Sequence, residues 1–241
     1  MWRALYRQEK LAFKIIISDG GMLIMNLSVR NVSKTLRNNT VISDISVEWS
    51  SGHIYGLKGI NGAGKTMLMR LISGLLRPSQ GEIYFDGEKL GAKFDFAPSI
   101  GLLLENPGFL AHYTGFQNLA MIASLNQKIS SAQIQNVLNR VGLDTQKNKK
   151  YRKYSLGMQQ RLGIAAAIME TPDLIILDEP LNALDSSGCE LAKSIIREER
   201  DRGALIVLTC HNSEDLYALS DQVYTLEAGR IVQIEAGKRI C

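Results

Sequence analysis

Hydrophobic and polar residues alternate in two stretches near the start of the chain. Residues 27–30 read Leu-Ser-Val-Arg, and residues 41–49 alternate more clearly. A period of two is typical of strands with one buried and one solvent-facing side. Glu82–Phe85 is a further predicted strand, because the tight-turn pair Asp86-Gly87 follows it. Together these segments predict an antiparallel β-subdomain in the N-terminal part of the chain.

Unbroken apolar runs form the second pattern. They occur at Ile54–Leu57, Ile100–Leu104, Leu174–Leu177 and Ala204–Leu208. Strands with no polar residues between the apolar ones are expected where a parallel sheet is covered on both faces. Shorter strand signals near 222–226 and 230–234 follow them. We therefore predict an α/β fold with a mostly parallel sheet.

The pattern changes over residues 106–170, where strand signals are lacking. Thr114 and either Ser130 or Ser131 are candidate caps for helices over 115–125 and 132–141. Residues 186–202 are predicted to form a crossover helix between two apolar strands. The expected organisation is a single domain over 22–241, with a helical subdomain inserted at about 105–165.

Residues 1–21 differ from the rest, being basic and then briefly apolar. The segment lacks the long apolar core and the cleavage site of a secretory signal. We interpret it as an extension without a role, with Met22 and Met25 as alternative starts. The alternative is a short membrane-surface anchor, since Trp2 and Phe13 lie among basic residues.

Net charge, the length of apolar runs and the spacing of cysteines exclude several classes of partner and site. The chain has 241 residues and a net charge of +4, which comes mainly from residues 1–21 and from Lys238 and Arg239. The remaining body is near neutral, so no nucleic-acid partner is expected. No apolar run approaches the roughly 18 residues of a membrane span. The cysteines Cys189, Cys210 and Cys241 show neither metal-ligand nor disulfide spacing.

A phosphate-binding loop follows the first apolar run. The residues Gly59, Ile60, Asn61, Gly62, Ala63, Gly64, Lys65 and Thr66 match G-x-x-x-x-G-K-S/T, and a helix is predicted from Met67. Glycines allow the backbone N–H groups to approach an anion at the positive end of that helix. Lys65 would contact the β- and γ-phosphates, and Thr66 would offer its hydroxyl to Mg²⁺. Met67 is a further predicted nucleotide-binding residue.

An acidic pair follows a second apolar run. Asp178 and Glu179 come directly after Leu174–Leu177. In phosphate-loop ATPases an acidic residue at such a strand end holds Mg²⁺, and Asp178 fits that role. Glu179 is then placed to polarise the attacking water as a general base.

Three further motifs resemble those of the ATP-binding-cassette (ABC) family. Residues 154–161, Tyr-Ser-Leu-Gly-Met-Gln-Gln-Arg, resemble its signature motif. Leu181–Asp185 resembles its D-loop, and His211 resembles its switch histidine. The resemblance covers about residues 23–235, with the motifs in the order of that family.

The resemblance implies a head-to-tail dimer with ATP between the phosphate loop of one subunit and the signature of the other. Ser155 and Gly157 would bind the nucleotide at the start of a helix expected over Gln159–Met169, and Asp185 would bind it from the D-loop. His211 would act in catalysis by sensing the γ-phosphate. The Q-loop position, Glu105, would be a third Mg²⁺ contact besides Thr66 and Asp178.

Several positions depart from the family pattern. Leu156 replaces a signature glycine, Met158 stands where glutamine is usual, and Glu105 replaces the Q-loop glutamine. Leu36 stands where an aromatic ring usually stacks on adenine. The pattern Ser-Leu-Gly-Met with a Q-loop Glu is similar to that of bacterial exporters conferring bacitracin and lantibiotic self-protection.

The predicted function is that of the ATP-hydrolysing subunit of a bacterial exporter of a peptide or antibiotic. It would lie on the cytoplasmic face of the membrane as a homo- or heterodimer, and bind separate membrane-spanning permease subunits through about residues 105–150. One alternative is a catalytically weak regulatory subunit, which Leu36, Glu105 and Leu156 would favour. Another is a soluble ABC protein acting on ribosomes or DNA. The basic run at 147–153 is interpreted as solvated. The alternative is attraction to an acidic patch on a partner or to ATP across the dimer.

Overall fold

A computed structural model describes residues 25–104, 108–126, 128–146 and 148–238. The smaller of its two sheets is antiparallel, with strand order β2-β1-β4-β5. Its strands are β1 (Asn26–Leu36), β2 (Asn39–Ser50), β4 (Gln80–Phe85) and β5 (Glu88–Lys89). The predicted turn joins β4 to β5, with positive φ at both Asp86 (50°) and Gly87 (79°), as a tight hairpin requires.

The larger sheet has the order β10-β9-β3-β8-β7-β6. Its strands are β3 (Ile54–Lys58), β6 (Ile100–Leu103), β7 (Leu174–Leu177), β8 (Leu205–Leu208), β9 (Gln222–Glu227) and β10 (Arg230–Ala236). All neighbours are parallel except β10, which is antiparallel to β9. The sheet is therefore mostly parallel, as predicted.

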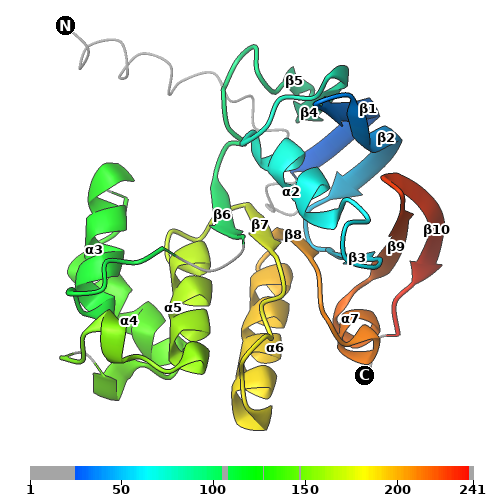
Figure 1. Cartoon of the computed structure of the whole chain (residues 1–241). Coiled ribbons are helices and arrows are strands. Elements are labelled where there is room, and N and C mark those ends of the chain that lie inside the picture. The colour runs from blue at the N-terminus through cyan, green and yellow to red at the C-terminus, as the bar shows by residue number, and fades with distance from the viewer. Residues whose placement is uncertain (1–24, 105–107, 127, 147, 239–241) are drawn as a thin grey trace, which may run out of the picture.

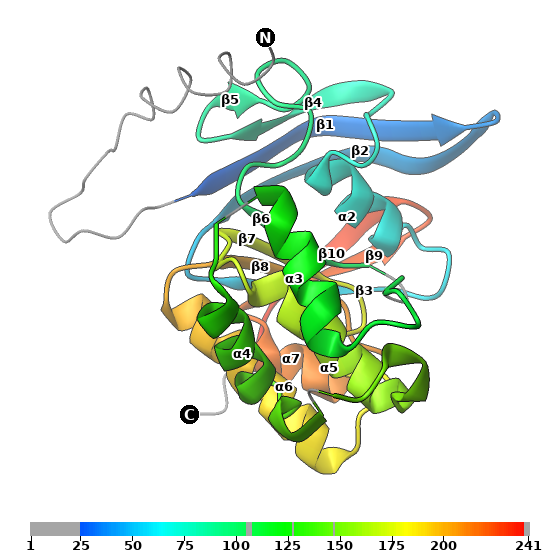
Figure 2. The same ribbon diagram turned by 90° about the vertical axis from the view of Figure 1, so that its left-hand side faces the viewer.

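Helices pack on both faces of this sheet, and others lie outside them in a separate helical part (Figure 1). They are α2 (Lys65–Ser73), α3 (Gly115–Asn126), α4 (Ser131–Arg140), α5 (Leu156–Ile168), α6 (Ser186–Asp201) and α7 (Ser213–Leu219), with 3₁₀ turns η2 (Asp144–Gln146) and η3 (Tyr151–Lys153). The small sheet lies at the top of Figures 1 and 2, and α4 and α6 lie at the opposite end. Helix α5 contacts α3, α4 and β6. It therefore joins the sheet to α3 and α4, which together with their connecting segments form the helical part of the fold.

Two apolar cores explain the unbroken runs. In β8, Leu205 and Val207 belong to the core shared with the small sheet and α2. Ile206 and Leu208, which alternate with them, belong to the core shared with α4, α5 and α6. Each residue of such a strand is buried on one face or the other, so no polar position interrupts the run.

Helix starts follow local capping chemistry. Ser130 caps α4, accepting from the Gln133 N–H, while the Gln133 side chain accepts from the Ser130 N–H. This reciprocal pair selects Ser130 over Ser131. The helix expected from Gln159 begins at Leu156 instead, because the Ser155 hydroxyl accepts from the Met158 N–H and caps it.

Some predictions concern residues that are not described. Residues 1–21 lie outside the described part, and so does Glu105. The predicted limits of the domain and of its helical subdomain stay predictions. Within the described ranges, no helix is both long enough and apolar enough to cross a membrane.

Candidate functional site

The phosphate loop connects β3 to α2 through a chain of close contacts. Gly64, with φ of 107°, is the N-cap of α2. A Cβ at Gly59 would lie 2.5 Å from the Leu226 carbonyl oxygen, so the loop packs directly on β9. Both positions require glycine, for the positive φ or for the close approach. The result is a loop whose backbone meets the N-terminus of α2, where helix N–H groups favour an anion.

The side chains of the loop are placed in different ways. Lys65 Nζ donates to the carbonyl oxygens of Gly59 (2.7 Å) and Ile60 (3.1 Å), which holds the ammonium over the loop. The Ile60 side chain is 82% exposed. Ala63 is buried in the core, so only its backbone can serve a ligand.

Asp178 connects the acidic strand end to the loop helix. Thr66 Oγ1 donates to Asp178 Oδ2 at 2.6 Å, and Thr209 Oγ1 donates to Asp178 Oδ1 at 2.6 Å. The adjacency arises because β7, which ends at Leu177, is separated from β3 only by β8. The sequence therefore placed Asp178 and Thr66 correctly in relation to each other, although they lie far apart in the chain.

The donor set suits a hard cation completed by a ligand. A hydroxyl and a carboxylate oxygen are the kind of donors that Mg²⁺ takes, usually together with phosphate oxygens and water. In the described ranges no group of three or more His, Cys, Asp or Glu could hold a metal by itself. Thr66 and Asp178 would therefore hold Mg²⁺ only together with a bound nucleotide.

Glu179 lies beside Asp178 in a left-handed backbone conformation, with φ of 51°. Its N–H donates to Thr209 Oγ1 (2.8 Å), and its carbonyl oxygen accepts from Gln160 Nε2 (2.9 Å). Its carboxylate accepts from the amide of Asn182. Contacts from several elements thus fix the residue predicted to be the general base.

These groups open onto one cavity of about 530 Å³, a size within the usual range of ligand sites. Its lining residues are Val41, Asn61, Gly62, Gly64, Lys65, Thr66, Met67, Gln160, Asp178, Glu179 and Asn182. Five of the eight loop residues therefore line it, together with Asp178, the predicted metal ligand, and Glu179, the predicted base.

Gly59, Ile60 and Ala63 of the loop do not line this cavity, and neither do four predicted residues from other motifs. Ser155 is exposed at the N-terminus of α5, and His211 is exposed after β8. Asp185 is exposed at the N-terminus of α6. At Gly157, a Cβ would lie 2.9 Å from the Ala183 carbonyl oxygen, so this glycine packs against the D-loop. Leu36, questioned as an adenine contact, ends β1 and is 39% exposed.

Asp185 caps α6 by accepting from the Gly188 N–H at 2.8 Å. This hydrogen bond, and a weaker one from the Ser187 hydroxyl, lower the pKa of Asp185 below its usual range. The carboxylate is therefore ionised at neutral pH and is already used in capping.

Sequence reasoning missed Val41, Gln160, Asn182 and Thr209. Gln160 and Asn182 lie within the signature and D-loop runs, so their polar side chains were available as signals. Thr209 is a buried polar residue whose hydroxyl is hydrogen-bonded to both Asp178 and Glu179. Its position just after an apolar strand was a weaker signal. Val41 comes from β2 of the other sheet, which no local pattern connects to the loop.

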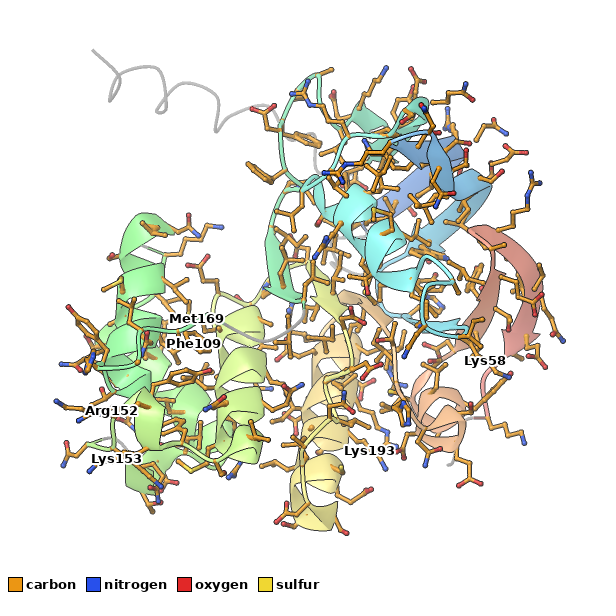
Figure 3. All side chains as sticks on the ribbon, viewed as in Figure 1. Lys58, Phe109, Arg152, Lys153, Met169 and Lys193 are labelled. Carbon is orange, nitrogen blue, oxygen red and sulfur yellow. The ribbon has the colours of Figure 1, made fainter. Side chains whose placement is uncertain are left out.

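The basic run before the signature faces outward. Arg152 and Lys153 are exposed at the outer side of the helical part, as Figure 3 shows. Lys149 Nζ contacts Met158 Sδ at 3.7 Å. This arrangement agrees with a solvated face; Lys147 lies outside the described residues.

Comparisons with known proteins agree with this geometry. Residues 42–182 match the sequence model of the ABC transporter family. An uncharacterized ABC transporter ATP-binding protein of Bacillus subtilis is 42% identical over 205 residues, covering 85% of this chain and 94% of the relative. The bacitracin transport ATP-binding protein BcrA of Enterococcus faecalis is 36% identical, with 88% and 70% covered. The lantibiotic transport ATP-binding protein SrtF of Streptococcus pyogenes is 31% identical, with 86% and 89% covered.

Solved structures show the same fold. The structure of an ATP-binding subunit of an ABC transporter has a TM-score of 0.78 at 25% identity, covering 87% of this chain and 89% of that one. A dimeric ATP-binding cassette in a post-hydrolysis state with ADP and Pi has a TM-score of 0.81 at 21% identity, covering 89% and 100%. With its phosphate loop and acidic strand end on one cavity, the chain belongs to the ABC transporter family as an ATP-binding, ATP-hydrolysing subunit.

Proposed function

We propose that this chain binds Mg-ATP in the 530 Å³ cavity and hydrolyses it with Glu179 as the general base. The observation that carries the proposal is the 2.6 Å hydrogen bond from Thr66 to Asp178, which brings the phosphate loop to the acidic strand end. Lys65 and the loop N–H groups bind phosphate, and Thr66 and Asp178 hold Mg²⁺. When bound, Mg²⁺ supplies charge neutralisation at the phosphates.

Glu179 accepts the proton of the attacking water at its carboxylate, which faces the cavity beside Asn182. His211 is exposed and does not line this cavity, so it would act on the γ-phosphate after a rearrangement or closure of the site. Glu105, which lies outside the described residues, is a third proposed metal contact.

The chain acts as a head-to-tail dimer, either with itself or with another ABC ATPase. Support comes from Ser155 and Gly157, which lie at the N-terminus of α5 but do not line the cavity of their own chain. A helix N-terminus attracts phosphate. The signature of one subunit would then complete the site of the other.

The work of ATP hydrolysis is delivered to a separate membrane-spanning permease. Large apolar side chains are exposed on the helical part, at Leu110 (44%), Tyr113 (41%), Met121 (44%) and Leu125 (81%). Exposed apolar surface of this kind often marks an interaction site. The chain would lie on the cytoplasmic face of the cell membrane and power the export of a peptide or antibiotic. The relatives named for bacitracin and lantibiotic transport support that substrate class.

The test is the ATPase activity of the purified chain and of two variants. Glu179→Gln keeps the shape of the side chain but removes the base, so the rate should fall at least about 100-fold while ATP binding persists. Lys65→Ala should abolish tight ATP binding. Gln135→Ala is the control, because its amide donates to Asn139 (3.0 Å) on α4 and Gln135 does not line the cavity. A dimer trapped by ATP in Glu179→Gln, seen by gel filtration, would support head-to-tail closure.

Hydrolysis by Glu179→Gln at the wild-type rate would show that the base is misassigned. A second function remains open, because Leu156 is 70% exposed at the signature, where the family usually has glycine. A branched side chain there would crowd a nucleotide held across a dimer. A wild-type rate no higher than that of Lys65→Ala would identify a regulatory subunit that needs an active partner.

A further inference from the structure

Glu179 has a backbone conformation that L-amino acids rarely adopt. Its φ of 51° lies in the left-handed region, which is unfavourable for a residue with a Cβ. Such a conformation persists only where surrounding contacts hold it, and it is often found at functional sites. The contacts that hold Glu179 therefore bear on its function.

The backbone of Glu179 is fully hydrogen-bonded. Its N–H donates to Thr209 Oγ1 at 2.8 Å. Its carbonyl oxygen accepts from the Asn182 N–H (3.2 Å) and from Gln160 Nε2 (2.9 Å). The first two contacts come from the next strand and from the turn itself. The third comes from α5, a different part of the fold, and it crosses 19 positions of sequence.

The carboxylate of Glu179 is also held. Its Oε2 accepts from Asn182 Nδ2, and both side chains line the cavity. A general base is effective only when its oxygen lies within hydrogen-bond reach of the proton it takes. A side chain that fixes the carboxylate therefore affects the rate through Glu179.

We propose that Gln160 and Asn182 are positioning residues for Glu179. Gln160 donates to the carbonyl oxygen of Glu179 and so stabilises the left-handed turn. Asn182 holds one carboxylate oxygen and so fixes the direction of the side chain. The inference rests on the proposed function, since it takes Glu179 to be the base.

The position of Gln160 has a consequence for coupling. Gln160 lies on α5, about one turn beyond the Ser155 cap. The same helix contacts α3 and α4. A displacement of α5 relative to β7 would stretch the Gln160–Glu179 hydrogen bond. The base of one subunit is thereby tied to the position of its own signature helix.

The test uses Gln160→Met, Gln160→Glu and Asn182→Ala in the full chain. Methionine keeps the length of the Gln160 side chain and has no hydrogen-bond donor. Glutamate keeps its shape and, when ionised, only accepts hydrogen bonds. We expect each variant to lower kcat about 10- to 100-fold, because small misplacements of catalytic groups have effects of this size. The KM for ATP and the Tm should change little.

Asn126→Ala is the matched control. Asn126 Nδ2 donates to Glu170 Oε2 at 2.9 Å, which is the same amide-to-carboxylate contact away from the cavity. This variant should keep the wild-type kcat. Loss of activity in Gln160→Met but not in Gln160→Glu would mean that packing rather than hydrogen bonding matters, and would overturn the role given to Gln160.

A double-mutant cycle separates positioning from a general structural effect. If Gln160 and Asn182 act through Glu179, adding either substitution to Glu179→Gln should not lower the residual rate further. Multiplicative losses would overturn the proposal, as would a wild-type kcat in all three single variants. If Glu179→Gln itself retains the wild-type rate, the proposed function fails instead, so the two failures are distinguishable.

Discussion

Replacing Thr209 by valine tests whether one buried hydroxyl holds the acidic pair together. Thr209 is 0% exposed, and its Oγ1 accepts from the Glu179 N–H and donates to Asp178 Oδ1. Valine has nearly the same shape, so no cavity is created, but both partners lose their contact. Thr209→Val therefore isolates the hydrogen bonds from the packing.

The magnitude follows from the two contacts. A neutral hydrogen bond contributes about 1 kcal/mol and one to a charged group about 2 kcal/mol, so the free energy of unfolding should fall by about 3 kcal/mol. For a chain of this length, that loss corresponds to a decrease in Tm of about 6–12 °C. The ATPase rate should fall as well, because Asp178 and Glu179 both lose a fixed partner.

The assay is thermal unfolding by circular dichroism, with Thr209→Ser as the comparison. Serine keeps the hydroxyl and loses one methyl group, which costs about 1 kcal/mol. We expect Thr209→Val to be less stable and less active than Thr209→Ser. The reverse order would show that packing of the methyl group dominates, and that the hydroxyl does not organise the site.

Two further predictions concern other residues. Gly157→Ala would place a Cβ 2.9 Å from the Ala183 carbonyl oxygen, so the D-loop must shift. We expect the ATPase rate to fall at least about tenfold, because groups of the site are misplaced, while Tm stays nearly unchanged. A wild-type rate would contradict this reasoning. Burial raises the pKa of the Cys210 thiol to about 12, and only the thiolate reacts readily. Iodoacetamide at about pH 8 should therefore label Cys210 only after unfolding, as peptide mass spectrometry can show, and rapid labelling of the native protein would refute its burial.

The sequence by itself determined the elements and much of the chemistry. Alternation identified the strands of the small sheet, and apolar runs identified the strands of the larger one. The loop from Gly59 to Thr66 and the pair Asp178 and Glu179 identified a phosphate site and its acidic partners. These signals are local, because side-chain periodicity and turn chemistry depend on residues a few positions apart.

Capping was predicted less completely. The exact start of α5 at Leu156 depends on which hydroxyl accepts from the first free N–H groups, and Ser155 does so. The sequence contained this serine, but we predicted it as a nucleotide contact and not as a cap.

Only the tertiary structure decided which side chains surround the site. Val41 reaches the cavity from the other sheet, and Gln160 reaches Glu179 from α5. Thr209, the residue after β8, is hydrogen-bonded to both Asp178 and Glu179. Such contacts depend on the packing of layers and on strand order, and residues distant in sequence carry no local trace of them. The geometry that holds Glu179 therefore depends on the assembled fold, whereas the phosphate loop can be predicted from its local sequence.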